Sequence, residues 1–213
     1  MHVFYLHGFA SSPRSSKAAY LRERFLAHGV QLRCPDFNPP EFATLTMTRM
    51  IEQLLGEIQT LAAGPVTLLG SSLGAVVAIQ AAARLPDRVR RLVLLAPAVR
   101  FPHDAHRVLG NDAMERWQST GILEVFHYGF GGMQPLKYDF YEDGLRYDVS
   151  AVDAAQPTLI FQGRHDRAVD YRDVETYAAA RPGTILVLMD DDHQLIASLP
   201  RIWSGILEFL DLT

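Results

Sequence analysis

The sequence has one cysteine, no long apolar run and no surplus of basic charge. The single cysteine, Cys34, excludes an internal disulfide and a metal site built from several thiolates. Lysine and arginine number 20 against 24 aspartates and glutamates, a net charge of −4, so the balance does not favour binding to nucleic acid. No apolar stretch reaches the roughly 20 residues that a membrane span needs.

Two further features narrow the class of protein. The apolar run Met1–Leu6 has no basic residue before it and no small-residue cleavage pattern after it, so we expect no secretion signal and a cytoplasmic location. A content of 48% hydrophobic and 21% charged residues is that of an ordinary globular protein and excludes a disordered chain. The partner we expect is a small molecule, and the sequence does not indicate an oligomeric state.

Short apolar runs alternate with helical patterns along the chain. Most of the runs are continuously apolar, which is typical of strands covered on both faces. The predicted strands are Val3–Leu6, Pro65–Leu69, Leu92–Leu95, Thr158–Phe161 and Thr184–Met189, with Val30–Arg33 as a weaker sixth. The predicted helices are Ser15/Ser16 to Gly29, Met47 to Ala62, Ser72 to Arg84, Tyr171 to Ala180, and Trp203 to Leu210. This alternation predicts one α/β domain over residues 1–213, with a mainly parallel sheet of about six strands and helices on both faces.

One stretch, at about 101–156, breaks the rhythm and is too long for a simple crossover. We interpret it as a small cap-like insertion over one end of the sheet. It is rich in aromatic residues, of which Trp117, Phe126 and Tyr128 are the candidate substrate-binding residues. The alternative is that these aromatics only pack the core of the insertion itself.

The segment Gly70-Ser71-Ser72-Leu73-Gly74 matches the G-x-S-x-G pattern. A predicted strand precedes it and a predicted helix follows it, which is the setting in which this pattern forms a sharp turn. Such a turn lifts the Ser72 hydroxyl out at the carboxyl end of the sheet, beside the free N–H groups of a helix N-terminus. The alternative is an ordinary Gly-Ser turn that caps a helix.

A serine hydroxyl is a poor nucleophile until a base removes its proton. Of the eight histidines, His193 is best placed to be that base, because it follows the predicted strand Thr184–Met189 after a short acidic turn. The alternative is a solvated loop histidine. His103 and His106 have the spacing of a metal-ligand pair, but no third ligand accompanies them, so we expect no metal and no cofactor.

The base in turn needs a carboxylate that orients its ring. The predicted strand Thr158–Phe161 runs into Gly163, where the chain can turn, and Asp166 follows three residues later. We predict Asp166 as the partner of His193 because the tight turn places it nearest the strand end. Asp170 is the rival.

The negatively charged oxygen of a tetrahedral intermediate needs two N–H donors. One candidate is the N–H of Leu73, directly after the nucleophile, and the other is the N–H of Phe9, in the loop that follows the first strand. Removing one such donor typically costs about 3 kcal/mol of transition-state stabilisation.

With these residues identified, the sequence resembles an α/β-hydrolase over nearly its whole length, and the order serine, aspartate, histidine is the order of that superfamily. More narrowly, it resembles the small bacterial YqiA-like serine esterases. The resemblance rests on Leu6-His7-Gly8-Phe9, on Ser11-Ser12-Pro13-Arg14-Ser15 with Lys17-Ala18, on Gly70-Ser71-Ser72-Leu73-Gly74, on Pro97-Ala98-Val99-Arg100 and on Asp170-Tyr171-Arg172. It implies a carboxylesterase with Ser72 as nucleophile, Asp166 as acid and His193 as base.

We therefore expect a serine hydrolase that cleaves short- to medium-chain carboxylic esters through an acyl-enzyme. A thioesterase, lactonase, peptidase or C–C hydrolase could use the same three residues, because they fix the nucleophile and not the leaving group. A binding protein that keeps the fold without turnover is the third possibility. The aromatic insertion favours an apolar acyl site, and the lack of a basic cluster argues against a polyanionic substrate.

Overall fold

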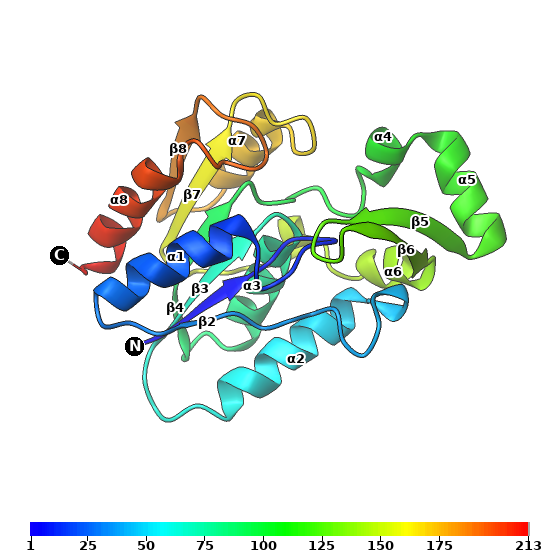
Figure 1. Ribbon diagram of the computed structural model, residues 1–213. Coiled ribbons are helices and arrows are strands. Elements are labelled where there is room, and N and C mark those ends of the chain that lie inside the picture. The colour runs from blue at the N-terminus through cyan, green and yellow to red at the C-terminus, as the bar shows by residue number, and fades with distance from the viewer. Residues whose placement is uncertain (213) are drawn as a thin grey trace.

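A sheet of six parallel strands runs through the centre of the computed structural model, which describes residues 1–212 (Figure 1). In spatial order the strands are β2 (Leu32–Arg33), β1 (His2–Leu6), β3 (Val66–Ser71), β4 (Val89–Leu95), β7 (Thr158–Gly163) and β8 (Thr184–Met189). The predicted parallel sheet is therefore confirmed. Strand β4 starts three residues earlier than predicted, because Val89 is buried and pairs with Val66.

Helices cover both faces of this sheet, as the continuously apolar strands predicted. Side chains alternate along β1: Phe4 and Leu6 pack on one face, and Val3 and Tyr5 pack on the other. The first face is covered by α2 (Met47–Gln59), α3 (Leu73–Arg84) and α7 (Tyr171–Ala179), and the second by α1 (Ser16–Ala27) and α8 (Leu199–Leu210). Strands β1, β3, β4 and β7 thus each contribute buried residues to two hydrophobic clusters, which helps to fix the positions of the strand ends.

The chain between β4 and β7 forms elements of its own beside the main sheet (Figure 1). Two of them, β5 and β6, pair as an antiparallel hairpin. The elements are α4 (Ala105–Leu109), α5 (Asn111–Thr120), β5 (Ile122–His127), β6 (Gly132–Lys137), α6 (Asp139–Gly144) and the short 3₁₀ helix η2 (Val149–Ala151), and another 3₁₀ helix, η1 (Phe42–Thr44), precedes α2. Inside this segment, the Trp117 indole donates a hydrogen bond to the Leu136 carbonyl over 3.0 Å, which ties α5 to the hairpin.

A carboxylate joins this segment to the start of α2. Asp143, on α6, accepts hydrogen bonds from the Thr48 backbone N–H at 2.7 Å and from the Thr48 hydroxyl at 2.6 Å. The same hydroxyl contacts the Tyr147 hydroxyl. Because the N–H groups in the first turn of a helix have no partner within the helix, a carboxylate there satisfies a group that would otherwise be unpaired.

A second connection joins the hairpin to the loop after β1. His127, which is completely buried, contacts the Asn38 side-chain oxygen through Nε2 at 2.9 Å, and the Asn38 amide donates to the Ser11 carbonyl at 3.0 Å. The Tyr128 N–H donates to the Ala10 carbonyl in the same loop. Burial and the nearby His7 lower the pKa of His127, so its ring is neutral at neutral pH. Its Nε2–H can then donate to Asn38 while Nδ1 accepts the Phe130 N–H at 3.2 Å.

No helix within residues 1–212 is both long enough and apolar enough to cross a bilayer.

Replacing Asp143 by alanine should lower the free energy of unfolding by about 1–3 kcal/mol, because it leaves the Thr48 N–H and hydroxyl without their acceptor. Urea unfolding monitored by circular dichroism measures this. The matched control is Glu124→Ala, which removes an exposed carboxylate from β5 and should change stability by less than about 0.5 kcal/mol. Equal stability of the two variants would contradict an anchoring role for Asp143.

Candidate active site

Ser72 lies at a sharp turn between β3 and α3. Its backbone has φ 53° and ψ −116°, a conformation that a residue with a side chain rarely adopts. The Ser72 N–H donates to the Leu95 carbonyl at the end of β4, so the neighbouring strand helps to hold this strained turn.

Glycine is required on both sides of Ser72. A Cβ atom on Gly70 would lie 2.5 Å from the Ala75 Cα, and one on Gly74 would overlap the Leu6 carbonyl oxygen at the end of β1. The first turn of α3 therefore packs directly against two strands, and a side chain at either position would push it away from them.

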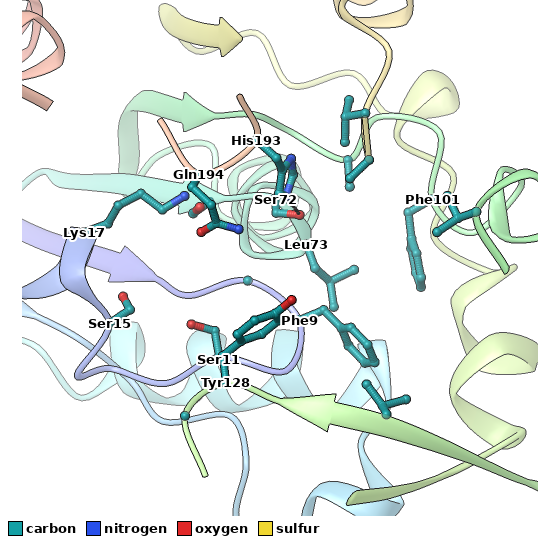
Figure 2. A pocket seen from close by; sticks show the side chains of 18 of the residues that line it. Phe9, Ser11, Ser15, Lys17, Ser72, Leu73, Phe101, Tyr128, His193 and Gln194 are labelled. Carbon is teal, nitrogen blue, oxygen red and sulfur yellow. Dashed lines mark hydrogen bonds between the residues drawn. The ribbon is translucent and has the colours of Figure 1, made fainter. Parts of the chain in front are cut away.

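Ser72, His193 and Asp166 form a continuous chain of contacts. The Ser72 Oγ lies 3.1 Å from His193 Nε2, and His193 Nδ1 lies 2.8 Å from Asp166 Oδ2. Because the Asp166 carboxylate accepts the proton on Nδ1, Nε2 is left unprotonated and can accept the hydrogen bond of the serine hydroxyl. The structure thus brings together all three residues that the sequence analysis selected. Figure 2 shows Ser72 beside His193.

The Asp166 side chain is fully buried, and each of its oxygens is paired. Oδ1 accepts the backbone N–H groups of Ala168 and Val169 at 2.8 Å, and Oδ2 also accepts the Gln162 amide at 3.0 Å. Burial by itself raises the pKa of this carboxyl, but the hydrogen bond and charge of His193, with the N–H donors, outweigh it, so the pKa lies below its usual value. Asp166 is therefore ionised at neutral pH.

The other acidic candidates have different surroundings. Asp170 accepts the Arg172 N–H and caps α7. In the acidic turn before His193, Asp191 accepts the Ser198 N–H, and Asp190 contacts His165. Asp170 and Asp191 thus bind backbone N–H groups at the starts of helices.

Gly163 has a role beyond the one predicted for it. A Cβ atom there would lie 2.5 Å from the carbonyl oxygens of Asp191 and Asp192. The absence of a side chain at the end of β7 therefore allows the loop that carries His193 to pack against this strand. A larger residue would displace His193 from Asp166.

The two N–H groups predicted to bind an oxyanion lie beside Ser72. Leu73 is the first residue of α3, so its N–H has no acceptor within the helix. Phe9 follows Gly8, where an added Cβ atom would lie 3.2 Å from the Ser72 Cβ, so this loop passes directly next to the serine. Neither N–H donates to another group within residues 1–212, which leaves both free for a ligand.

A cavity of about 1410 Å³ opens at Ser72 and His193. One of its walls is apolar and comes largely from the segment between β4 and β7, with Phe101, Trp117, Leu123, Val125, Leu136 and Phe140. The opposite wall comes from the loop after β1 and the start of α1, and it includes Ser11, Ser15 and Lys17 (Figure 2). The nucleophile candidate thus lies between an apolar wall and a polar wall.

The three aromatic residues proposed to bind substrate have different positions. Trp117 and Tyr128 line the cavity, Trp117 as a nearly buried ring and Tyr128 as an exposed one. Phe126 is not among the described residues that line it. Alternate residues of a strand point to opposite faces, so Val125 faces the cavity and Phe126 faces away and contacts Tyr128 edge-on. This geometry corrects the expectation for Phe126.

The sequence analysis did not identify Lys17 as a residue of the site. Lys17 is only 7% exposed and lines the cavity. A signal is present in the sequence: Lys17, Leu21 and Phe25 are spaced by four residues, so the lysine lies on the apolar face of α1. For metals, the described residues contain no group of three His, Cys, Asp or Glu side chains that could hold an ion.

Two curated proteins are similar to this chain. A 2-hydroxymuconate semialdehyde hydrolase of Pseudomonas sp. (strain CF600) is 31% identical over 147 residues, which cover 56% of this chain and 52% of that protein. The matched part thus spans about half the length of that relative. A 2-(acetamidomethylene)succinate hydrolase of Mesorhizobium japonicum is 24% identical, with 98% of this chain and 87% of that protein covered.

Solved structures have the same fold. The α/β-hydrolase domain-containing protein 10 of mouse superposes with a TM-score of 0.82 at 20% identity, covering 99% of this chain and 89% of that one. Est1E of Butyrivibrio proteoclasticus, solved with ferulic acid bound, superposes with a TM-score of 0.84 at 20% identity, covering 99% and 88%. This likeness shows that the chain has the α/β-hydrolase fold.

The family comparison agrees with the resemblance seen in the sequence. The family described as "Uncharacterised protein family (UPF0227)" matches residues 2–210, nearly the whole chain. The chain therefore belongs to UPF0227, the YqiA-like family, and has the α/β-hydrolase fold.

Proposed function

We propose that this protein is a serine hydrolase that cleaves carboxylic esters through an acyl-enzyme. The observation that carries the proposal is the chain of contacts from the Ser72 hydroxyl through the His193 ring to the buried carboxylate of Asp166, at 3.1 and 2.8 Å. The names of the two curated relatives, both hydrolases, support hydrolytic chemistry. The ferulic acid bound to Est1E supports a substrate built on a carboxylic acid.

In the first half of the reaction, the Ser72 oxygen attacks the ester carbonyl carbon while His193 Nε2 takes the hydroxyl proton. The carbonyl oxygen becomes negatively charged and binds the N–H groups of Phe9 and Leu73. Asp166 stabilises the imidazolium through Nδ1–H. When the intermediate collapses, the C–O bond to the alcohol breaks, His193 returns the proton to the leaving oxygen, and the acyl group stays on Ser72.

In the second half, water replaces the alcohol. His193 Nε2 takes a proton from the water as its oxygen attacks the acyl carbon, and the same two N–H groups bind the new oxyanion. Collapse breaks the bond to the Ser72 oxygen, which recovers its proton from His193. The products are a carboxylic acid and an alcohol, and the enzyme returns to its starting state.

The same residues could act on a thioester, lactone, amide or C–C bond, because the leaving group is not set by the nucleophile. The curated relatives make an alternative substrate a real competitor, since neither is named for an ester. Comparing kcat/KM for matched esters, thioesters and amides separates these activities. Turnover of amides alone would overturn the proposal that the substrate is an ester, but the roles proposed for Ser72, His193 and Asp166 would stand.

Replacing Ser72 by alanine should lower kcat on a p-nitrophenyl ester by about 10⁶-fold, the scale found when a complete serine–histidine–aspartate site loses its nucleophile. A fluorophosphonate should also form one adduct with the unaltered protein, seen by intact-mass spectrometry, and none with Ser72→Ala.

The matched control is Ser204→Ala, which removes an exposed hydroxyl from α8 and should keep both activity and labelling. Normal turnover by Ser72→Ala would show that another residue is the nucleophile. Labelling of Ser72 without turnover on a broad substrate panel would favour a binding protein instead.

Replacing Asp166 by asparagine should lower kcat by about 10⁴-fold, because an amide does not hold the His193 tautomer that accepts the serine proton. Asp170→Asn is the matched control, since it removes the charge of the rival carboxylate; asparagine can still cap α7, and kcat should stay within about twofold. Steady-state kinetics with p-nitrophenyl acetate measures both. A larger loss for Asp170→Asn than for Asp166→Asn would reverse the assignment of the acid.

A further inference from the structure

Lys17 is a largely buried lysine whose ammonium reaches the cavity. Its side chain comes from the first turn of α1, is 7% exposed and lines the cavity beside Ser72 and His193. No hydrogen bond or ion pair joins its ammonium to any group within residues 1–212. The carboxylates of Asp166, Asp191 and Asp192 act on it through space only.

The position of this charge destabilises the folded chain in two ways. Burial lowers the pKa of Lys17 to about 8, against the opposing effect of the three aspartates. The first turn of a helix is also the positive end of its dipole, where a cation is unfavourable. An apolar residue would continue the stripe of Leu21 and Phe25 without either cost. The lysine therefore needs an explanation outside the stability of α1.

The surroundings of Lys17 form a polar end of the cavity. Ser11 and Ser15 line the same wall, and Arg14 lies at its exposed rim. In Figure 2, Lys17 points toward Gln194 and lies on the side of Ser72 and His193 opposite to Phe101. A molecule that reaches Ser72 can thus extend into an apolar region on one side and meet the ammonium on the other.

We propose that Lys17 is a specificity-determining residue that binds a carboxylate carried by the substrate away from the ester bond. The inference rests on the proposed function and names its substrate class: esters that also carry a carboxylate. A carboxylate fits better than a phosphate because Lys17 is largely buried, whereas Arg14 and Arg167 in the same lining are exposed, and because the nearby Asp192 repels a doubly charged group more strongly than a singly charged one.

The test compares esters that differ only in this charge. On the acyl side, the p-nitrophenyl monoesters of adipic and suberic acids are compared with the same esters whose free carboxylate is replaced by an amide. On the alcohol side, 4-acetoxybenzoate is compared with 4-acetoxybenzamide. In at least one series, Lys17→Met should lower kcat/KM for the substrate with the free carboxylate about 10- to 100-fold, which is the range for losing a charge-assisted hydrogen bond. Most of this loss should come from a higher KM. The kcat/KM of the matching amide substrate should change less than about threefold.

Two further variants separate binding from general effects. Arg24→Met removes one positive charge from the same helix outside the cavity and should leave the preference unchanged. Lys17→Gln keeps a polar side chain and should lose the preference as Lys17→Met does. If Lys17 only steadied the acidic turn before His193, both substrates would slow equally in every series, and that result overturns the proposal.

A direct binding measurement keeps this inference separate from the proposed function. Isothermal titration with adipate should give a dissociation constant that rises about 10-fold or more in Lys17→Met. Adipate binding that depends on Lys17, without turnover of any ester, would support the carboxylate site and overturn the esterase. Ester turnover with neither adipate binding nor a preference for carboxylate substrates would support the esterase and overturn the carboxylate site.

Discussion

The candidate site depends on the buried negative charge of Asp166. A carboxylate without water must be paired, and this one takes hydrogen bonds from the backbone after β7, from Gln162 and from His193. These bonds fix the loop, the carboxylate and the histidine ring as a unit. The ring then meets Ser72, whose strained turn is held from the other side by the packing of α3 on β1 and β3. The Ser72 hydroxyl thus lies where two separately held parts of the fold meet.

Much of this arrangement could be predicted from the sequence, because the strands are covered on both faces and so appear as uninterrupted apolar runs. The G-x-S-x-G pattern selected Ser72, and the rule that the carboxyl ends of parallel strands meet at one edge then selected Asp166 and His193. It could not give the reason for Gly163, whose neighbour is a loop almost thirty residues later. The interior of the segment between β4 and β7 was also beyond reach, because its hairpin strands are half exposed and follow no continuous apolar pattern.

The residues that line the substrate cavity were predicted less well than the serine, histidine and aspartate, for a physical reason. An aromatic residue stabilises a protein wherever it is buried, so the type of residue does not say which face of β5 is turned to the cavity, and Phe126 faces away. The charge balance had a similar weakness. Net charge sums the whole chain, whereas a single ammonium on a largely buried side chain acts more strongly on its surroundings than several exposed ones. The position of Lys17 on an apolar helix face was the informative signal.

The connection from His127 through Asn38 to Ser11, with that from Tyr128 to Ala10, has a consequence for how this family can diversify. The hairpin rests on the same loop that carries Phe9, one of the two donors next to Ser72. An exchange of the hairpin with that of a homologue would disturb this donor unless Asn38 and the loop were transplanted with it. Natural or engineered chimeras should therefore keep the Phe9 N–H in place only when the hairpin, Asn38 and the loop after β1 come from the same parent.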